Sequence, residues 1–501
     1  MKQIKLSLLF LLLGVATLSA QPRRYFDKIF NDVAVQTDIT YSTNATILLL
    51  TQFGQAVPQQ LKMDVYSPAG DTETNRPLVV MMHTGNFLPP QVNGGCSGTI
   101  KDADNVAMAR RLAQMGYVVA VADYRIGWNP IASTQTERVY TLINAAYRGV
   151  QDSRTCARFF RKSHANGNPY GIDPNKLIMW GIGTGGYISF ATATLDTITD
   201  TYIPKFLTPQ GPMVLEFLSG DVDGTKVGIN PGVPGLPFPA GDTLNYPNHV
   251  GFNSRFNLCV NLGGALGDLS WIDPGDSPMI SFHNPTDPFA PCETGIVLVP
   301  PPVNLPVVEV TGSCGAQPVF NAEGINNVFI NANFQDPLSV KARSINGNIE
   351  GFYPFLGNDS SPWAFSSGLS PYGVAGTNCD TASVAAGIYI DTIMTYFAPR
   401  ACAVLGLGAD CTVSSIKQLD QIEVGMTARP NPAVTDITLQ TDSAFPMLHI
   451  ELVDVAGRLV RTFYEVNNNQ YTIPRAGLDA GMYFARVTFK EGVVTQKIML
   501  R

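Results

Sequence analysis

The sequence predicts an α/β fold with a doubly wound, mostly parallel sheet, followed by a small all-β sandwich domain. Two observations favour the sheet. Short runs of consecutive apolar residues are typical of strands buried on both faces, and they alternate with longer segments of helical spacing. A third observation favours the second domain, because short alternating strands separated by turn residues run from residue 427 onward. The 501 residues, 45% of them apolar and 15% charged, suffice for a large core and an accessory domain.

The individual elements follow from this rhythm. The candidate strands are residues 61–66, 77–83, 117–122, 177–182, 256–262, 279–283 and, as the last one, 328–333. The candidate helices are residues 102–115, 138–164 and 187–195. Residues 205–250 are rich in glycine and proline and break the rhythm, so we expect an insertion there that acts as a lid or a pocket wall. Within it, residues 221–224 are expected to form a turn, because a calcium loop needs more ligands in register.

A strand, a glycine cluster and a helix follow one another between residues 177 and 195. In the nucleophile elbow, G-x-S-x-G, the same layout lifts a serine into a strained turn above the sheet. Here the middle position is Gly183. The glycines that the turn needs are therefore present, and the hydroxyl that the chemistry needs is absent.

The N-terminal residues predict export. Lys2 and Lys5 precede an apolar run and a small-residue cleavage site, so residues 1–20 are expected to be a signal peptide. That run is shorter than a membrane span requires, and no later segment qualifies. The net charge of −7 argues against a nucleic-acid or anionic-membrane partner. We expect a secreted or cell-surface protein with its main domain at 21–412, a linker at 413–426 and the β-domain at 427–501.

The chain has eight cysteines, an even number that fits an oxidising compartment. Connectivity cannot be read from sequence, and the two local pairs that we favour are Cys292–Cys314 and Cys402–Cys411. Cys259 lies in an apolar run and is expected to be a buried thiol. No CxxC or Cys/His cluster indicates zinc, so neither a metal nor another cofactor is expected.

Several motifs in order give the first domain its resemblance to a known fold family. They are Met63-Asp64-Val65-Tyr66 with Pro68, the strand 77–83 leading into Thr84-Gly85-Asn86-Phe87, Asp123-Tyr124-Arg125, Tyr147-Arg148 with Gln151-Asp152, Gly171-Ile172-Asp173-Pro174, and His283 with Asp287. Over residues 58–355 the chain resembles the secreted, esterase-like branch of the α/β-hydrolases. The resemblance implies fold and ancestry, whereas function has to be argued from the site.

The resemblance assigns roles to a few positions. Residues 83–87 lie where the family has its His-Gly-Gly-Gly oxyanion segment, so Gly85 and Asn86 would offer backbone N–H groups and Thr184 would offer another. A plain strand-ending turn is the alternative. Asp287 occupies the position of the triad acid, which orients an imidazole, or is simply a turn aspartate.

The general base is missing from the expected place. In the family a histidine follows the last strand, but the sequence around Gln335 and Asp336 contains none before the β-domain. The positions that attack and transfer the proton are thus both empty. Thr184 or Ser189 could supply a hydroxyl, although neither has a visible base.

The C-terminal module resembles the sorting domain of the type IX secretion system of Bacteroidetes. The motifs that carry this resemblance are Pro430-Asn431-Pro432 with Asp436, residues 453–460 (VDVAGRLV), residues 478–484 (LDAGMYF) and Lys497-Ile498-Met499-Leu500. The resemblance implies that the module addresses the protein to the type IX machinery. A carbohydrate-binding β-sandwich is the alternative.

Two functional hypotheses follow. In the first, the protein is a non-catalytic α/β-hydrolase-fold protein that binds a small-molecule, glycan or ester ligand or a partner. In the second, it is an active secreted carboxylesterase-type serine hydrolase with an unrecognised nucleophile and base. A serine or threonine hydroxyl within hydrogen-bonding reach of a histidine would favour the second hypothesis.

Overall fold

The computed structural model describes residues 23–93, 95–299, 303–357, 359–366, 381–407, 419–455, 459–463, 466–489 and 492–501. The signal peptide predicted for residues 1–20 and Cys411 of the second predicted disulfide lie outside these residues. The chain divides into two compact units, of which the second comprises residues 413–501 together with Phe334–Val340. Among the described residues, no helix is both long and apolar enough to cross a membrane.

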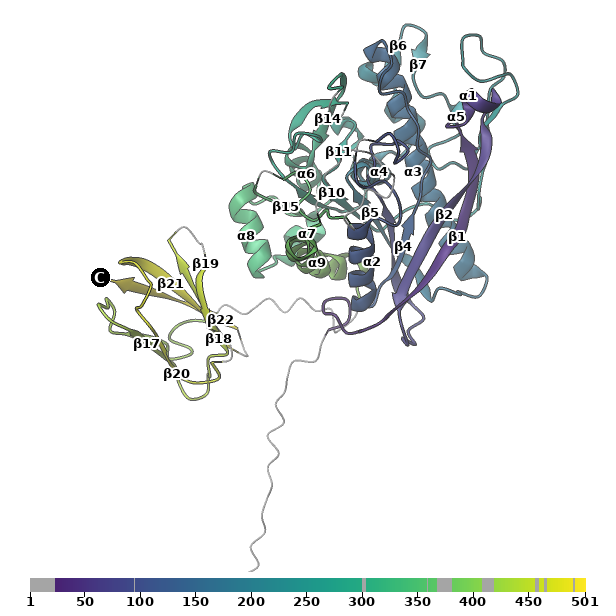
Figure 1. The fold of residues 1–501 in the computed structure, drawn as a ribbon. Helices are drawn as coiled ribbons and strands as arrows, with labels where there is room; N and C mark the ends of the chain where they lie inside the picture. The colour runs from purple at the N-terminus through teal and green to yellow at the C-terminus, as the bar shows by residue number, and fades with distance from the viewer. Residues whose placement is uncertain are drawn as a thin grey trace, which may run out of the picture. The chain divides into compact units, whose positions relative to one another are not determined.

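An eight-stranded sheet forms the centre of the first unit (Figure 1). Its strands are β1 (Val33–Thr46), β2 (Val57–Pro68), β3 (Arg76–Met82), β4 (Val118–Ala122), β5 (Ile172–Ile182), β10 (Leu258–Leu262), β12 (Met279–His283) and β15 (Phe352–Pro354). They lie in the order β1-β2-β4-β3-β5-β10-β12-β15. β1 and β2 are antiparallel to their neighbours, and the six strands from β4 to β15 are parallel. The predicted α/β fold with a mostly parallel sheet is confirmed.

Helices cover both faces of this sheet (Figure 1). The long ones are α2 (Ala103–Met115), α3 (Gln135–Ala165), α4 (Thr184–Thr194) and α9 (Ser383–Leu405). Successive side chains of a strand point to opposite faces. In β5, Met179 packs into the core that includes residues of α3 and α4, whereas the ring of Trp180 contacts Phe397 of α9. The sheet is therefore buried on both sides, as the apolar runs predicted.

The last strand differs from the prediction. Residues 328–333, expected as a strand, lie largely in helix α7 (Asn327–Ala332), and the strand that completes the sheet is β15. A short apolar run has no periodicity that separates a strand from a buried helical turn. In α7 Phe329 is buried and Ile330 is exposed, so the run contributes one side chain to the core rather than a strand face.

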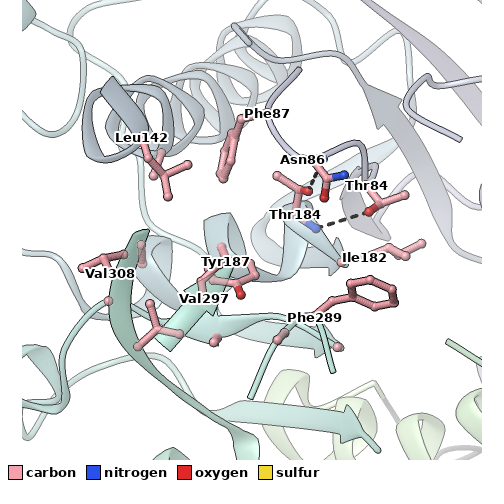
Figure 2. A pocket seen from close by; sticks show the side chains of 18 of the residues that line it. Thr84, Asn86, Phe87, Leu142, Ile182, Thr184, Tyr187, Phe289, Val297 and Val308 are labelled. Carbon is pink, nitrogen blue, oxygen red and sulfur yellow. Dashed lines mark hydrogen bonds between the residues drawn. The ribbon is translucent and has the colours of Figure 1, made fainter. Parts of the chain in front are cut away.

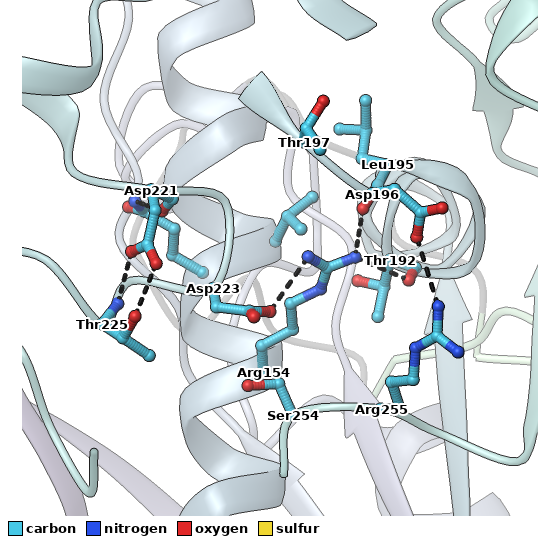
Figure 3. Close-up of polar contacts among 12 residues, drawn as sticks. Arg154, Thr192, Leu195, Asp196, Thr197, Asp221, Asp223, Thr225, Ser254 and Arg255 are labelled. Carbon is cyan, nitrogen blue, oxygen red and sulfur yellow. Dashed lines mark hydrogen bonds and ion pairs between the residues drawn. The ribbon is translucent and has the colours of Figure 1, made fainter. Parts of the chain in front are cut away.

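The insertion at residues 205–250 packs along α3, and Arg154 of that helix forms an ion pair with Asp223 of the insertion. Arg154 donates to the carboxylate of Asp223 at 3.1 Å and to the carbonyls of Thr192 and Leu195 at the end of α4 (Figure 3). Asp221 accepts from the backbone N–H and hydroxyl of Thr225, so residues 221–224 form the expected turn, closed by its own aspartate.

A smaller three-stranded sheet adjoins the central one. Its strands are β11 (Ala265–Leu266), β13 (Thr294–Leu298) and β14 (Pro306–Gly312), in the order β11-β14-β13. A disulfide joins Cys292 and Cys314 on either side of the β13–β14 hairpin, which confirms one of the two predicted pairs. Cys259 is a buried free thiol, as predicted, and Cys156 is another.

The second unit is an all-antiparallel β-sandwich. Its strands are β16 (Thr427–Arg429), β17 (Ile437–Gln440), β18 (His449–Asp454), β19 (Leu459–Phe463), β20 (Gln470–Ile473), β21 (Gly481–Thr488) and β22 (Val493–Leu500). They form one sheet of three strands and one of four around a separate core. Leu419, Val424 and Met426, which were expected in the linker, are buried in that core. The described part of this unit therefore begins before residue 427.

Candidate functional site

The elbow has the backbone of a nucleophile turn. β5 ends at Ile182, α4 begins at Thr184, and Gly183 between them has φ 53° and ψ −111°. The neighbouring glycines allow close approach: a Cβ on Gly185 would lie 2.1 Å from the carbonyl oxygen of Met82, and one on Gly181 would lie 1.9 Å from that of Gly185. The tight turn predicted from the glycine cluster is therefore present, with no side chain at its apex.

Thr84 fills the space where a side chain at the elbow would begin. A Cβ built on Gly183 would lie 2.3 Å from the Thr84 hydroxyl oxygen and 2.9 Å from its Cβ. Real Cβ atoms do not approach other atoms this closely. A serine at position 183 would therefore require the Thr84 side chain to rotate and shift.

Two of the three backbone N–H groups expected to form an oxyanion hole already have acceptors. The N–H of Thr184 donates to the Thr84 hydroxyl at 3.4 Å, and the N–H of Asn86 donates to the Thr184 hydroxyl at 2.7 Å (Figure 2). An oxyanion hole works because its donors are free to bind the developing negative charge. Here the hydroxyls of Thr84 and Thr184 accept from these two N–H groups, which are therefore not free to bind an oxyanion. Gly85 precedes Asn86 with φ 129°, and a Cβ there would lie 2.8 Å from the Cα of Gly98.

Asp287 holds its own loop. Its Oδ1 accepts from the N–H groups of Phe289 at 2.7 Å and Ala290 at 3.1 Å. Its Oδ2 lies 3.6 Å from Nε2 of His283, beyond hydrogen-bond distance. The carboxylate also lines the cavity described below. These contacts are those of a turn aspartate.

One serine of the first unit does bond a histidine, but away from the cavity. The Ser313 hydroxyl lies 3.0 Å from Nδ1 of His283, and Nε2 of His283 lies 2.9 Å from the carbonyl of Ala290. Because a carbonyl only accepts, Nε2 carries the proton, and Ser313 donates to Nδ1. Both residues are completely buried, and neither lines the cavity. This pair is inaccessible to a substrate. A second pair, His449 with Thr488, lies in the β-sandwich.

The place expected for the base was wrong because the last strand was misassigned. Gln335 and Asp336 precede β15, and Asp336 accepts from Ser339 at the start of α8 (Pro337–Asn346). Residues 355–382, which join β15 to α9, also contain no histidine in the sequence. The ring of Trp363, which belongs to this segment, lies close to Asp287. A Cβ on Gly263 would lie 3.4 Å from the Trp363 ring and 3.9 Å from Asp287 Oδ2.

A cavity of about 520 Å³ adjoins the elbow and includes Gly183, Thr184 and Asp287 in its wall. Its volume lies in the range of small-molecule sites, roughly 300–1,000 Å³. The insertion at residues 205–250 contributes Phe206 to the cavity wall, whereas strands β13 and β14 contribute several residues. The apolar lining includes Val139, Leu142, Ile143, Ala146, Val150, Val297, Leu298, Val308 and Val310. Figure 2 shows Leu142, Val297 and Val308 on the opposite side of the view from Thr84 and Asn86.

The polar part of the wall contains a residue that the sequence did not single out. Asp104, in the first turn of α2, lines the cavity, as do the polar residues Asn86, Asn93 and Ser97. Burial and the neighbouring charge of Asp102 raise the pKa of Asp104 to about 7, although the Asn105 N–H and His83 act in the opposite direction. An acidic residue in the first turn of a helix is ordinary. No pattern in the sequence therefore marked it as a cavity residue.

His83 lies in the segment that carries Thr84, and its pKa is raised. Burial alone would lower its pKa, but the hydrogen bond with Asp123 and the negative charges of Asp123 and Asp102 outweigh that effect and raise the pKa. Its Nδ1 lies within hydrogen-bond distance of the Thr84 carbonyl, and its ring stacks on Tyr124. His83 thus supports the loop that carries Thr84 and does not itself line the cavity.

Two family matches cover separate parts of the chain. Residues 63–212 match the BD-FAE family, and residues 428–501 match the secretion system C-terminal sorting domain. The chain is an esterase-like protein with a type IX sorting domain. The sorting domain directs this esterase-like protein to the cell surface or the extracellular space and implies an interaction with the type IX machinery. No curated protein matches the chain.

Several solved structures resemble the esterase-like protein weakly. Esterase 2 of Thermogutta terrifontis phosphorylated by paraoxon has 15% identity and a TM-score of 0.36, with 75% of this chain and 96% of that chain covered. The apo form of the same esterase has 14% identity and a TM-score of 0.34, with 76% and 97% covered. The propionate-bound form has 15% identity and a TM-score of 0.32, with 68% and 89% covered. The sheet order and the family match therefore carry the fold assignment.

The two-unit organisation leads to a prediction about export. A chain that ends at residue 412 should fold but accumulate in the periplasm, because the β-sandwich has a separate core and carries the sorting signal. Cell fractionation and a thermal melt of the purified truncation measure both parts. The intact chain is the control. Efficient release of the truncated chain from the cell would contradict the sorting role, and an unfolded truncation would contradict the independence of the two cores.

Proposed function

We propose that the esterase-like domain is a non-catalytic ligand-binding protein. The observation that carries this proposal is at the elbow, where the hydroxyls of Thr84 and Thr184 accept from two of the three N–H groups expected to bind an oxyanion, those of Thr184 and Asn86. The apex of the turn is Gly183, and the loop after β15 has no histidine. The cavity beside the elbow is nevertheless retained. A protein that keeps the pocket and lacks the reacting groups is suited to binding.

The size of the expected deficit supports this proposal. Removing members of a catalytic triad lowers the rate by several orders of magnitude, and what survives comes from the oxyanion hole and from substrate binding. In this chain the hole is occupied as well. Reopening it would require Thr84 and Thr184 to give up hydrogen bonds before any oxyanion could bind.

The alternative is an active carboxylesterase, and the match to the BD-FAE family favours it. The hydroxyls that it could use are poorly placed. Thr184 already accepts from the Asn86 N–H, and Ser189 is completely buried in α4. Ser313, the hydroxyl of this unit that does bond a histidine, is also completely buried. An active site would therefore need a rearrangement of one of these segments.

Ester turnover separates the two functions. The mature protein should hydrolyse short-chain nitrophenyl esters no faster than an unrelated protein of similar composition, because the described residues that line the cavity include no histidine to activate a hydroxyl and two of the expected oxyanion donors already have acceptors. A serine-directed phosphonate provides the second readout and should leave the protein unlabelled. Turnover that the phosphonate abolishes, with the label mapped to one serine, would establish the esterase instead and identify its nucleophile.

A further inference from the structure

The two ends of the cavity differ in chemistry. One end is apolar and lies between α3, α4 and the β13–β14 hairpin, with Leu142, Val297 and Val308 in its wall. The polar part of the wall includes residues from the loop after β3 and from the start of α2, which supply Asn86 and Asp104. Apolar walls with a few polar groups at one end fix the orientation of a ligand. The occupant should therefore have an apolar body and one polar end.

The charge of the cavity wall restricts that polar end. Among the described residues that line the cavity there are two carboxyl groups, those of Asp104 and Asp287, and no lysine, arginine or histidine. A carboxylate or phosphate ligand would meet like charge with no basic partner in the wall. A ligand that donates hydrogen bonds, and above all a cationic one, would meet opposite charge.

The two carboxyl groups are not equally available. Asp287 already accepts from the N–H groups of Phe289 and Ala290. Asp104 is 3% exposed, and the donors to its carboxyl among the described residues are backbone N–H groups of its own turn, that of Asn105 at 2.9 Å and that of Asp104 itself, with no side chain among them. A buried carboxyl with so few donors is costly unless another group pairs with it. The missing donors at Asp104 can come from a ligand in the cavity.

We propose that the cavity binds an amine, with the ammonium group at Asp104 and the apolar body between α3, α4 and the β13–β14 hairpin. This inference rests on the proposed binding function and adds the chemical class of the ligand. The ammonium supplies up to three N–H donors to the Asp104 carboxylate and the amide oxygens nearby, and a charge-assisted pair of this kind is about twice as strong as a neutral one. An alcohol would supply one neutral donor at the same place.

A matched series of ligands tests this inference with the intact protein. 4-Phenylbutylamine, 4-phenylbutanol and 5-phenylpentanoate share the same phenyl ring and four methylene groups and differ only in the polar end. Calorimetry at about pH 8, where the amine is protonated, should give the tightest binding for the amine, by about tenfold over the alcohol, and the weakest for the acid. Amine binding should weaken as the pH falls through about 7, because Asp104, flanked by the charges of Asp102 and His83, then takes up a proton.

Variants assign the effect to Asp104. Asp104→Asn keeps the shape and removes the charge, so it should bring the amine-to-alcohol affinity ratio to about one. Asp38→Asn is the matched control, since Asp38 is exposed on β1, outside the cavity lining, and the ratio should stay as in the unmodified protein. Val308→Trp, which fills the apolar end, should weaken all three ligands together.

The outcomes separate this inference from the function on which it rests. Binding of all three ligands with equal affinity, or with the acid tightest, would overturn the amine inference while leaving the binding function intact. No binding of any of the three would overturn the amine inference as well, and the ester-turnover assay then decides the proposed function independently. A preference for the amine that survives Asp104→Asn would also contradict the role given to this carboxyl.

Discussion

Gly183→Ser should lower the free energy of unfolding by about 2–4 kcal/mol and add no ester turnover. The new Cβ would meet the Thr84 hydroxyl oxygen at 2.3 Å, and the left-handed φ of 53° adds strain for any residue with a side chain. No base stands near the new hydroxyl, and a serine without a base is a weak nucleophile. Denaturant titration and a nitrophenyl-ester assay measure the two parts of this prediction.

Two further variants show whether Thr84 is the cause. Gly183→Ser combined with Thr84→Gly should recover most of the lost stability, because the second change removes the atoms that the serine would meet. Gly387→Ser is the matched control, since Gly387 has open space around it in α9 and should change stability little. A Gly183→Ser protein as stable as the unmodified one would show that Thr84 does not occupy the nucleophile's place. The triple variant that also carries Trp363→His is the one expected to gain turnover in the nitrophenyl-ester assay, because position 363 lies near Asp287.

Asp104→Asn should stabilise the protein at about pH 8, by up to about 4 kcal/mol, and leave its stability unchanged near pH 3. Burial and the charge of Asp102 raise the pKa of Asp104 from 3.8 to about 7. A carboxyl with a raised pKa is fully accommodated only while it is protonated. Its contribution is therefore intact below about 3.8 and is lost as the pH rises through about 7, roughly three units at 1.36 kcal/mol each. Asparagine is neutral throughout and avoids that loss.

The measurement is a pair of urea titrations at each pH, with Asp38→Asn as the control. The difference between Asp104→Asn and the unmodified protein should grow between about pH 4 and pH 8 and then level off, since Asp104 is ionised above that range. The Asp38 variant should show no such trend because Asp38 is exposed. An Asp104→Asn protein that is less stable at high pH would mean that this carboxylate already has good partners inside the unliganded fold.

The sequence predicted the buried sheet and the turn at Gly183 better than the site around them. Runs such as residues 77–83 and 177–182 are unambiguous because strands covered on both faces admit only apolar side chains. β1 was missed because it is an edge strand with many exposed polar residues. Residues 328–333 were misassigned because a short apolar run fits a helical turn equally well.

The site was harder to predict because its decisive contacts join distant segments. Thr84 and Asn86 were recognised as departures from a glycine-rich loop, but only the fold brings the hydroxyl of Thr84 to the apex at Gly183. Asp104 has an ordinary place in the first turn of a helix, and its burial in the cavity wall depends on the loop that packs against it. The sequence alone showed that no histidine lies between Asp287 and the β-domain. The segment where a base would be expected could be identified only once β15 was known to be the last strand.

The bond between Cys292 and Cys314 has a consequence for when the cavity can be filled. It encloses the β13–β14 hairpin, which supplies Val297 and Val308 to the cavity wall, in a loop with a sequence separation of 22 residues. Closing a loop of this length stabilises the fold by about 3 kcal/mol, and thiols in the cytoplasm are kept reduced. The disulfide that stabilises this part of the cavity wall therefore forms only after the chain has left the cytoplasm. Newly synthesised protein would therefore leave the cytoplasm without a ligand, and any ligand would be bound in the periplasm or outside the cell.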